Sequence, residues 1–291
     1  MGFRHIACSL LMSAGLFAAS GEGQAADCIS GRVDYDKWGH QIAALSLVLD
    51  ADARRVCGSL AIRVRARNDP RLNVNVFATY PEFDKPGDAA EKRYNDWIRG
   101  VVATMDFDRP ITLSRDEKVE DVLVLASLYR SGRMISAAYD RWLCCGAHGI
   151  SAGGSINIDV ASGSLVSPQD LFSLPAVANQ CWQQFAALPG PVDGHGALFK
   201  QDYPMDRRFA DKDFEGDPGS PPAGGLLAPS VEKTVRLFNA TLKRSSNWTF
   251  TDRGSVVGFG MLLGYVSAAF ECTLDNAALK PMARPGVAVP P

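Results

Sequence analysis

Residues 119–144 have the sequence VEDVLVLASLYRSGRMISAAYDRWLC, and this stretch decides the fold. Val119 to Tyr129 is a nearly continuous run of apolar and β-branched residues, which is typical of a buried strand. Ser131-Gly132 is a turn signal, and Met134 to Cys144 is a second strand-like run. Two such runs joined by a short turn predict a β-hairpin, so the chain contains antiparallel sheet.

A strand and a helix are predicted before this hairpin. Apolar and polar residues alternate from Leu72 to Tyr80 with a period of two, and the strand ends at Pro81. Asp88 then caps a predicted helix, because an aspartate side chain can accept hydrogen bonds from the first turn. The apolar residues that fall at helical spacing behind it are Ala90, Tyr94, Trp97, Ile98, Val101, Val102 and Met105.

The second half of the chain also mixes strands and helices. Ser167-Pro168 predicts a helix start, with the helix running towards Ala187, and Ser230 caps another helix. The strands predicted here are residues 155–160, 164–167, 248–251 and 256–266. Hairpins and separate helices without strict alternation indicate an α+β protein, with helices packed on a mainly antiparallel sheet and with disulfides adding stability.

Composition excludes several classes of protein. The 291 residues are 46% hydrophobic and 21% charged, which is typical of a globular protein and not of a disordered chain or a coiled coil. Thirty Lys and Arg against 32 Asp and Glu give a formal net charge of -2. This balance provides no basic stripe to neutralise phosphates, so we do not expect nucleic acid as a partner.

The N-terminus predicts export. Arg4 is followed by an apolar stretch from Ile6 to Ala19 and by small residues up to Ala26, which is the pattern of a cleavable signal peptide. A stretch of about 14 residues spans only about 21 Å as a helix, which is too short for a comfortable membrane anchor. We therefore expect cleavage near Ala26, no transmembrane helix in the mature chain, and a periplasmic or secreted protein of a bacterial envelope.

We expect four segments along the chain. Residues 1–26 form the signal peptide, and residues 27–71 form an N-terminal extension that contains cysteine. Residues 72–282 form the α+β domain, with a subdivision near residue 115 left open, and residues 283–291 form a flexible tail.

Cysteine usage predicts disulfides. Cleavage removes Cys8 and leaves six cysteines, for which 15 pairings are open. We expect Cys28 to bond Cys57, since both lie in the N-terminal extension. Adjacent Cys144 and Cys145 would then bond separately to Cys181 and Cys272. The chain has no C-x-x-C pair, so we predict no metal site and no cofactor.

One motif raises an enzymatic alternative. Gly149-Ile150-Ser151-Ala152-Gly153 matches G-x-S-x-G, and Asp193 and His195 follow in the order found in α/β-hydrolases. A nucleophile elbow requires a helix after the serine, whereas a strand is predicted from Ser155 onward. We therefore favour a glycine-rich loop between strands and keep a serine hydrolase that uses Ser151, Asp193 and His195 as the alternative.

Other side chains receive structural interpretations. His148, in a glycine-rich turn, is interpreted either as a ligand contact or as a histidine that fixes the loop. Glu82 and Asp84 are interpreted as solvated loop acids. The tryptophans are interpreted mostly as core residues; they are Trp38, Trp97, Trp142, Trp182 and Trp248.

Three blocks of sequence carry a family resemblance. The first joins residues 78–83, ATYPEF, with the helix segment Tyr94 to Ile98. The second, which is the most specific, contains the Gly-Ala-His turn at residues 146–148, the Asp-x-x-x-Gly hairpin at residues 159–163 and the Asp-Leu-Phe sequence at residues 170–172. The third comprises residues 248–254, WTFTDRG, with residues 279–281, LKP.

These blocks resemble the RsiV-type extracytoplasmic domain family. Its best-known member is a lysozyme-sensing anti-sigma factor, and the domain also occurs beside peptidoglycan deacetylase modules. We expect neither a sigma-binding segment nor a spanning helix here, so the resemblance does not extend to transcriptional control. It implies a module that binds a lysozyme-type muramidase or a peptidoglycan fragment. A structural envelope scaffold is a further alternative.

The resemblance favours a binding surface built from loops. Residues 146–154 and the Pro- and Gly-rich segment 189–225 would insert into a partner's cleft. A basic lysozyme would need a local acidic surface. The residues expected to provide the binding contacts are His148, Asp206, Asp211, Asp213 and Glu215.

Overall fold

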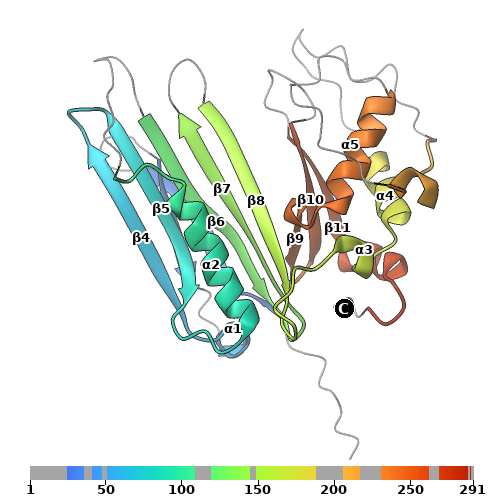
Figure 1. Ribbon diagram of the computed structural model, residues 1–291, viewed down its shortest axis with the longest axis horizontal. Coiled ribbons are helices and arrows are strands. Elements are labelled where there is room, and N and C mark those ends of the chain that lie inside the picture. Colours follow the sequence, from blue (N-terminus) through green and yellow to red (C-terminus); the bar gives the residue numbers. More distant parts are fainter. Residues whose placement is uncertain are drawn as a thin grey trace, which may run out of the picture.

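A computed structural model shows two lobes that each contain a sheet (Figure 1). It describes residues 25–35, 41–47, 51–108, 119–144, 149–187, 206–216, 231–261, 269–287 and 289. Residues 1–24 of the predicted signal peptide, the Gly-Ala-His turn and most of the segment 189–225 lie outside these residues.

The main sheet contains the predicted hairpin at its centre. Its strand order is β4-β5-β6-β7-β8, and the short β1 also pairs with β6. All neighbours are antiparallel except β5 and β6, which are parallel and joined through a helical crossover, as parallel strands require. The α+β class and the hairpin are therefore confirmed, with one parallel pair in the sheet. The strands are β1 (Ala26–Asp27), β4 (Leu60–Asp69), β5 (Val74–Phe83), β6 (Val119–Arg130), β7 (Met134–Cys144) and β8 (Gly149–Asp159).

Helix α2 (Ala89–Ala103) covers one face of the main sheet (Figure 1). Asp88 caps it as predicted, because its side chain accepts a hydrogen bond of 2.8 Å from the Glu91 N–H. Tyr94, Ile98 and Val102 are buried from the helix against the sheet. This amphipathic stripe confirms the helix predicted after Asp88.

A second hairpin covers part of the opposite face. It consists of β2 (Ile29–Tyr35) and β3 (Gln41–Leu47), and Leu45 of β3 packs on Val122 and Val124 of β6. The hairpin is followed by α1 (Ala51–Cys57) and then by β4. None of these elements was predicted from the sequence.

The second lobe has its own sheet and an aromatic core. Strand β10 lies between β9 and β11, and the buried rings of Trp182, Phe185, Phe238, Phe259 and Phe270 pack together beside it. The strands are β9 (Trp248–Thr251), β10 (Gly254–Met261) and β11 (Ala269–Asp275). The helices are α3 (Pro168–Leu171), α4 (Leu174–Ala187), α5 (Val231–Lys243) and α6 (Asn276–Leu279), with 3-10 turns η1 (Asp211–Phe214), η2 (Ser245–Asn247) and η3 (Lys280–Met282).

Two predictions for this half of the chain need correction. The single helix predicted from Ser167 to Ala187 is divided into α3 and α4, because Phe172 turns inward and stacks on Trp248 with ring centroids 5.7 Å apart. The strand predicted at residues 164–167 is only an isolated bridge between Ile158 and Leu165. Strand β11 was not predicted.

Buried hydrogen bonds join the two lobes. Asn157 of β8 donates to the carbonyls of Ser245 and Trp248 at 2.8 and 2.7 Å. The N–H of Phe250 donates to Ser136 Oγ of β7 at 2.8 Å. Because a buried polar group without a partner is costly, this set of bonds fixes β9 against one end of β7 and β8.

The disulfides confirm one predicted pair and correct the other. Cys28 is bonded to Cys57, as expected. Cys181 of α4 is bonded to Cys272 of β11, with Cα atoms 5.3 Å apart, so the prediction that these two bond separately to Cys144 and Cys145 is wrong. Cys181 and Cys272 face each other in the buried core of the second lobe, whereas Cys144 ends a strand of the main sheet. Cys145 lies outside the described residues.

In the described part of the chain, no helix is long and apolar enough to cross a membrane.

Removing the second disulfide should cost more stability than removing the first. The bonds span sequence separations of 29 and 91 residues, and the chain-entropy model assigns them about 3.5 and about 4.6 kcal/mol. We expect Cys181→Ala/Cys272→Ala to lower the free energy of unfolding by about 1 kcal/mol more than Cys28→Ala/Cys57→Ala in guanidinium titrations. An equal or reversed order would contradict this account.

Candidate functional site

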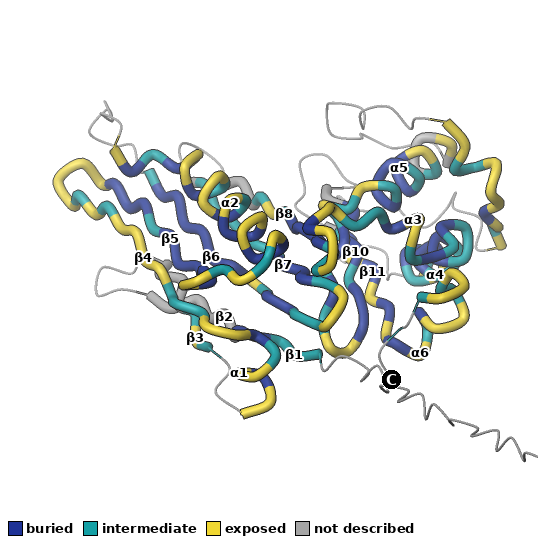
Figure 2. The backbone as a smooth tube through the Cα atoms, turned by 60° about the horizontal axis from the view of Figure 1, so that its bottom comes forward, coloured by how far each residue is buried: buried dark blue, intermediate teal, exposed yellow. Residues whose placement is uncertain are grey.

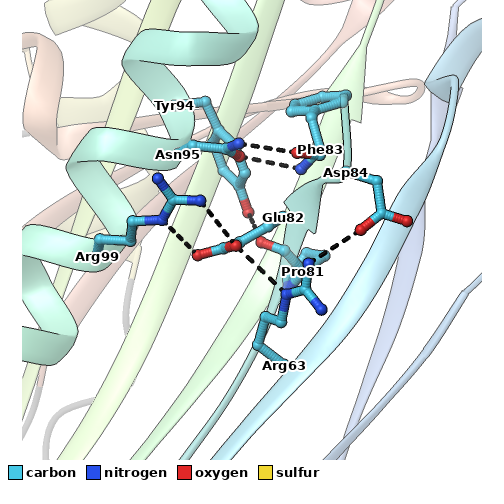
Figure 3. Close-up of polar contacts among 8 residues, drawn as sticks. All are labelled: Arg63, Pro81, Glu82, Phe83, Asp84, Tyr94, Asn95 and Arg99. Atoms are coloured by element: carbon cyan, nitrogen blue, oxygen red, sulfur yellow. Dashed lines mark hydrogen bonds and ion pairs between the residues drawn. The ribbon is translucent and has the colours of Figure 1, made fainter. Parts of the chain in front are cut away.

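A polar site lies between α2, the edge strand β4 and its neighbour β5. Glu82 of β5 lies at its centre, with Arg63 of β4 on one side and Arg99 of α2 on the other (Figure 3). Arg63 is opposite Tyr80 in the β4–β5 ladder, so strand alternation places it on the same face as Glu82. Helix α2 lies over that face and brings Arg99 to it.

Glu82 is held by two guanidinium groups. Arg99 donates to both carboxylate oxygens, at 2.8 and 3.0 Å, and Arg63 Nε donates to the second oxygen at 3.3 Å. The Glu82 side chain is only 8% exposed. The hydrogen bond from Arg99 is the largest factor that lowers the pKa of Glu82. Glu82 is thus a buried, ion-paired strand residue, and its interpretation as a solvated loop acid is wrong.

Hydrogen bonds from α2 fix the strand that carries Glu82. Asn95 accepts from the Phe83 N–H at 3.0 Å and donates to the Phe83 carbonyl at 2.9 Å. The hydroxyl of Tyr94 donates to the Pro81 carbonyl at 2.9 Å, and burial raises the pKa of Tyr94 well above its usual value. The two parts of the first resemblance block therefore contact each other directly (Figure 3).

A hollow of about 440 Å³ opens beside these ion pairs. Three of its lining side chains are cationic and three are acidic. Lys92 and Asp96 of α2 are exposed, and their side chains form no hydrogen bond or ion pair within the described residues. Asp84 forms an ion pair with Arg63, with the nitrogen and oxygen atoms 2.9 Å apart. The lining residues are Arg63, Glu82, Phe83, Asp84, Pro86, Lys92, Asn95, Asp96 and Arg99. The hollow can therefore offer both signs of charge to a polar ligand.

The G-x-S-x-G segment does not form a nucleophile elbow. Residues 149–153 lie within β8, and Ser151 is paired with Trp142 in the antiparallel ladder with β7. A strand continues on both sides of the serine, where an elbow would have a strained turn into a helix. The glycine-rich loop favoured from the sequence is also absent here. Asp193, His195 and His148 lie outside the described residues.

The four acidic residues expected to provide binding contacts all lie in the described segment 206–216, where basic residues lie among them. Asp206, Asp211 and Glu215 are exposed. Asp213 is engaged locally, since it accepts from the Ala210 N–H at 2.9 Å. The basic residues of the same segment are Arg207, Arg208 and Lys212. The described segment 206–216 therefore offers no uniformly acidic surface.

A carboxyl pair lies where the N-terminal strand meets the second lobe. Burial, followed by a hydrogen bond with Asp252, raises the pKa of Asp27 to about 6. Arg253, whose side chain is almost fully exposed, reaches Asp252 at 3.8 Å. Tyr129 of β6 is opposite Asp27 in the ladder. This pair joins two structural elements.

Comparisons with known proteins find solved structures that are distantly similar to the chain. No protein-family model matches it, and no curated protein matches it. Two structural neighbours are DUF3298 family proteins. The one from Pseudomonas aeruginosa PAO1 is 13% identical, with a TM-score of 0.41, and the match covers 80% of this chain and 99% of that chain. The one from Bacteroides fragilis is 11% identical, with a TM-score of 0.32, and the match covers 90% and 94% of the two chains.

Removing the charge of Glu82 should destabilise the protein in a pH-dependent way. Its pKa is lower in the folded chain than in the unfolded chain, so its stabilising contribution is present at neutral pH. The contribution is lost as pH falls through the folded pKa. We expect Glu82→Gln to lower the free energy of unfolding at pH 7 by about 1–3 kcal/mol, because two guanidinium groups lose their acceptor.

The matched control is Glu232→Gln, which removes an exposed ion pair with Arg236 on α5. That pair is 73% exposed on the Glu232 side and should contribute no more than about 0.5 kcal/mol. Equal losses in the two variants at pH 7, or a Glu82→Gln loss that persists unchanged at low pH, would contradict the assignment.

Proposed function

We propose that the chain is an exported binding protein of the bacterial envelope that recognises a peptidoglycan fragment. The observation that carries the proposal is the hollow beside Glu82, which offers fixed guanidinium groups together with a free ammonium and a free carboxylate. Two disulfides support an oxidising compartment, since such bonds persist mainly outside the cytosol.

The chemistry of the hollow fits the peptide part of such a fragment. Stem peptides carry free carboxylates and amino groups on a short chain. Arg63, Arg99 and Lys92 can donate to carboxylates, and Asp96 can accept from an ammonium group. Glu82 holds both guanidinium groups before a ligand arrives, which reduces the entropy lost on binding. A volume of about 440 Å³ lies within the range of small-ligand sites.

A wall-directed enzyme of the lysozyme type is the other partner that the family resemblance implies. A strongly basic enzyme would be attracted by an acidic surface. The described segment 206–216 instead mixes four acidic residues with three basic ones. The described charges therefore favour the fragment over the enzyme.

Two exposed side chains of α2 allow a test that leaves the fold unchanged. We expect Lys92→Gln and Asp96→Asn each to weaken the binding of a purified muropeptide about threefold to tenfold in calorimetric titrations, because each removes one charge-assisted hydrogen bond. The melting temperature should change little, since both side chains are exposed and neither forms a hydrogen bond or an ion pair within the described chain. Lys280→Gln and Asp170→Asn are matched controls on exposed residues away from the hollow.

Failure of the wild-type protein to bind any muropeptide would contradict the proposed function. Unchanged affinity in both α2 variants would contradict the hollow as the site. A panel of lysozymes measured in parallel identifies the other partner: tight binding of a lysozyme without binding of muropeptides would overturn the fragment in favour of the enzyme.

A further inference from the structure

The face of β7 and β8 that points away from α2 carries an aromatic residue and an acid side by side. Tyr139 of β7 points to the helix side, because its ring lies 5.8 Å from that of Trp97 on α2. Side chains alternate along a strand, so Asp140 and Trp142 are on opposite sides of the sheet from Tyr139 and Arg141, respectively. Asp140 and Trp142 therefore share the face that α2 leaves uncovered.

Described elements cover this face beside β7, on β6, and at one end of β8. The hairpin β2–β3 packs on the β5–β6 part of the sheet through Leu45. The second lobe is bonded to Ser155 and Asn157 near the other end of β8. The β2–β3 hairpin and the second lobe approach the sheet at different places (Figure 2). Asp140 and Trp142 lie on β7 directly opposite Val124 and Val122, so they border the hairpin contact on β6 and the second-lobe contact on β8.

Both side chains lack a partner within the described chain. Trp142 is half-buried and has neither a ring contact nor a hydrogen bond there. Asp140 is exposed and has no hydrogen bond or ion pair there, and partial burial raises its pKa. Glu82 and Asp121 are ion-paired, whereas Asp140 has no ion pair within the described chain.

The residue opposite Asp140 on β8 is a glycine, so no side chain projects from the sheet at that position. Gly153 is paired with Asp140, and a Cβ atom at that position would lie 3.5 Å from the Asp140 carboxylate and 3.1 Å from the Tyr139 carbonyl. The carboxylate therefore lies over a strand position that has no side chain. A flat ligand can approach the strand backbone there while it contacts both Asp140 and Trp142.

This combination matches the surface of a sugar ring. A pyranose has an apolar C–H face, which packs on a flat indole, and equatorial hydroxyls, which donate to a carboxylate. The indole N–H of Trp142 supplies a donor for an acetamido or hydroxyl oxygen. The negative charge of Asp140 and the net charge of -2 disfavour phosphorylated and other anionic ligands. A neutral glycan is the ligand class that fits.

We propose that the Asp140–Trp142 face of β7 and β8 binds the glycan part of a wall fragment, a chain of uncharged N-acetylated amino sugars. The choice of amino sugar rests on the proposed function, whereas the sugar site itself rests on the face just described. The hollow lies on the α2 side of the main sheet and this face lies on the other side. Variants of the two sites therefore report on them separately.

The probe is the β-linked tetramer of N-acetylglucosamine, measured by calorimetric titration against the full mature chain. We expect Trp142→Ala to weaken binding at least tenfold, Asp140→Asn to weaken it about threefold to tenfold, and Trp142→Phe to retain part of the affinity because a flat ring remains. Asp170→Asn, on α3, removes an exposed carboxylate outside both sites and should bind the tetramer like the wild type. Leu165→Ala, which shortens an exposed apolar side chain elsewhere, is the control for Trp142→Ala.

The melting temperatures of Trp142→Phe and Asp140→Asn show whether a loss of tetramer affinity reflects unfolding. These two variants also provide the test if Trp142→Ala does not fold. Wild-type affinity in both, or no binding of the tetramer to the wild type, would overturn the proposal. Equal binding of the corresponding glucose tetramer would overturn the amino-sugar assignment. If muropeptides bind the wild type and Trp142→Ala equally, the glycan site is wrong while the proposed function stands.

Discussion

The register of the β6–β7–β8 ladder is the constraint on which the rest of the structure depends. Because side chains alternate, a slip of one residue would exchange the two faces of the sheet. Arg141 of β7 donates to both carboxylate oxygens of Asp121 of β6 at 2.7 Å, and a third donor reaches the Thr104 hydroxyl near the end of α2 at 2.7 Å. This pair holds the register and ties it to the helix side. Tyr139 then packs under α2, and Asp140 and Trp142 are left on the other face.

The parts of the fold that depend on local sequence were predictable. The central hairpin, the helix after Asp88 and the bond between Cys28 and Cys57 each follow from a pattern within about 30 residues. Strand β4 carried a usable signal, since Arg63, Arg65 and Arg67 alternate with apolar residues. That period of two was missed because arginines suggest a solvated segment, while their partners, such as Glu82, are distant in sequence. Glycines 149 and 153 favoured a loop, but pairing with β7 overrides that local preference.

The candidate sites could not be predicted from the sequence, for a related reason. Nothing local shows that Glu82 meets an arginine 17 residues later, because the contact requires α2 to lie across β5. Trp142 was interpreted as a core residue. Trp182 and Trp248 are buried in the core, but a tryptophan on a strand is buried only if another element covers its face of the sheet. The blocks that carry the family resemblance perform structural roles: Gly163, at φ 67°, packs against Ala89, and Gly254 approaches the Leu274 carbonyl. They specify turns and contacts of the fold, and the proposed ligand contacts lie elsewhere.

The central claim is that the ladder register presents Trp142 to a ligand while the other described tryptophans serve the core or the helix contact. The most direct measurement is the two-dimensional NMR spectrum of the five indole N–H groups during titration with the N-acetylglucosamine tetramer, with Trp142→Phe used to assign one signal. The account predicts that the Trp142 signal moves with ligand concentration while the signals of buried Trp182 and Trp248 stay in place. An unmoved Trp142 signal at saturating ligand would contradict it.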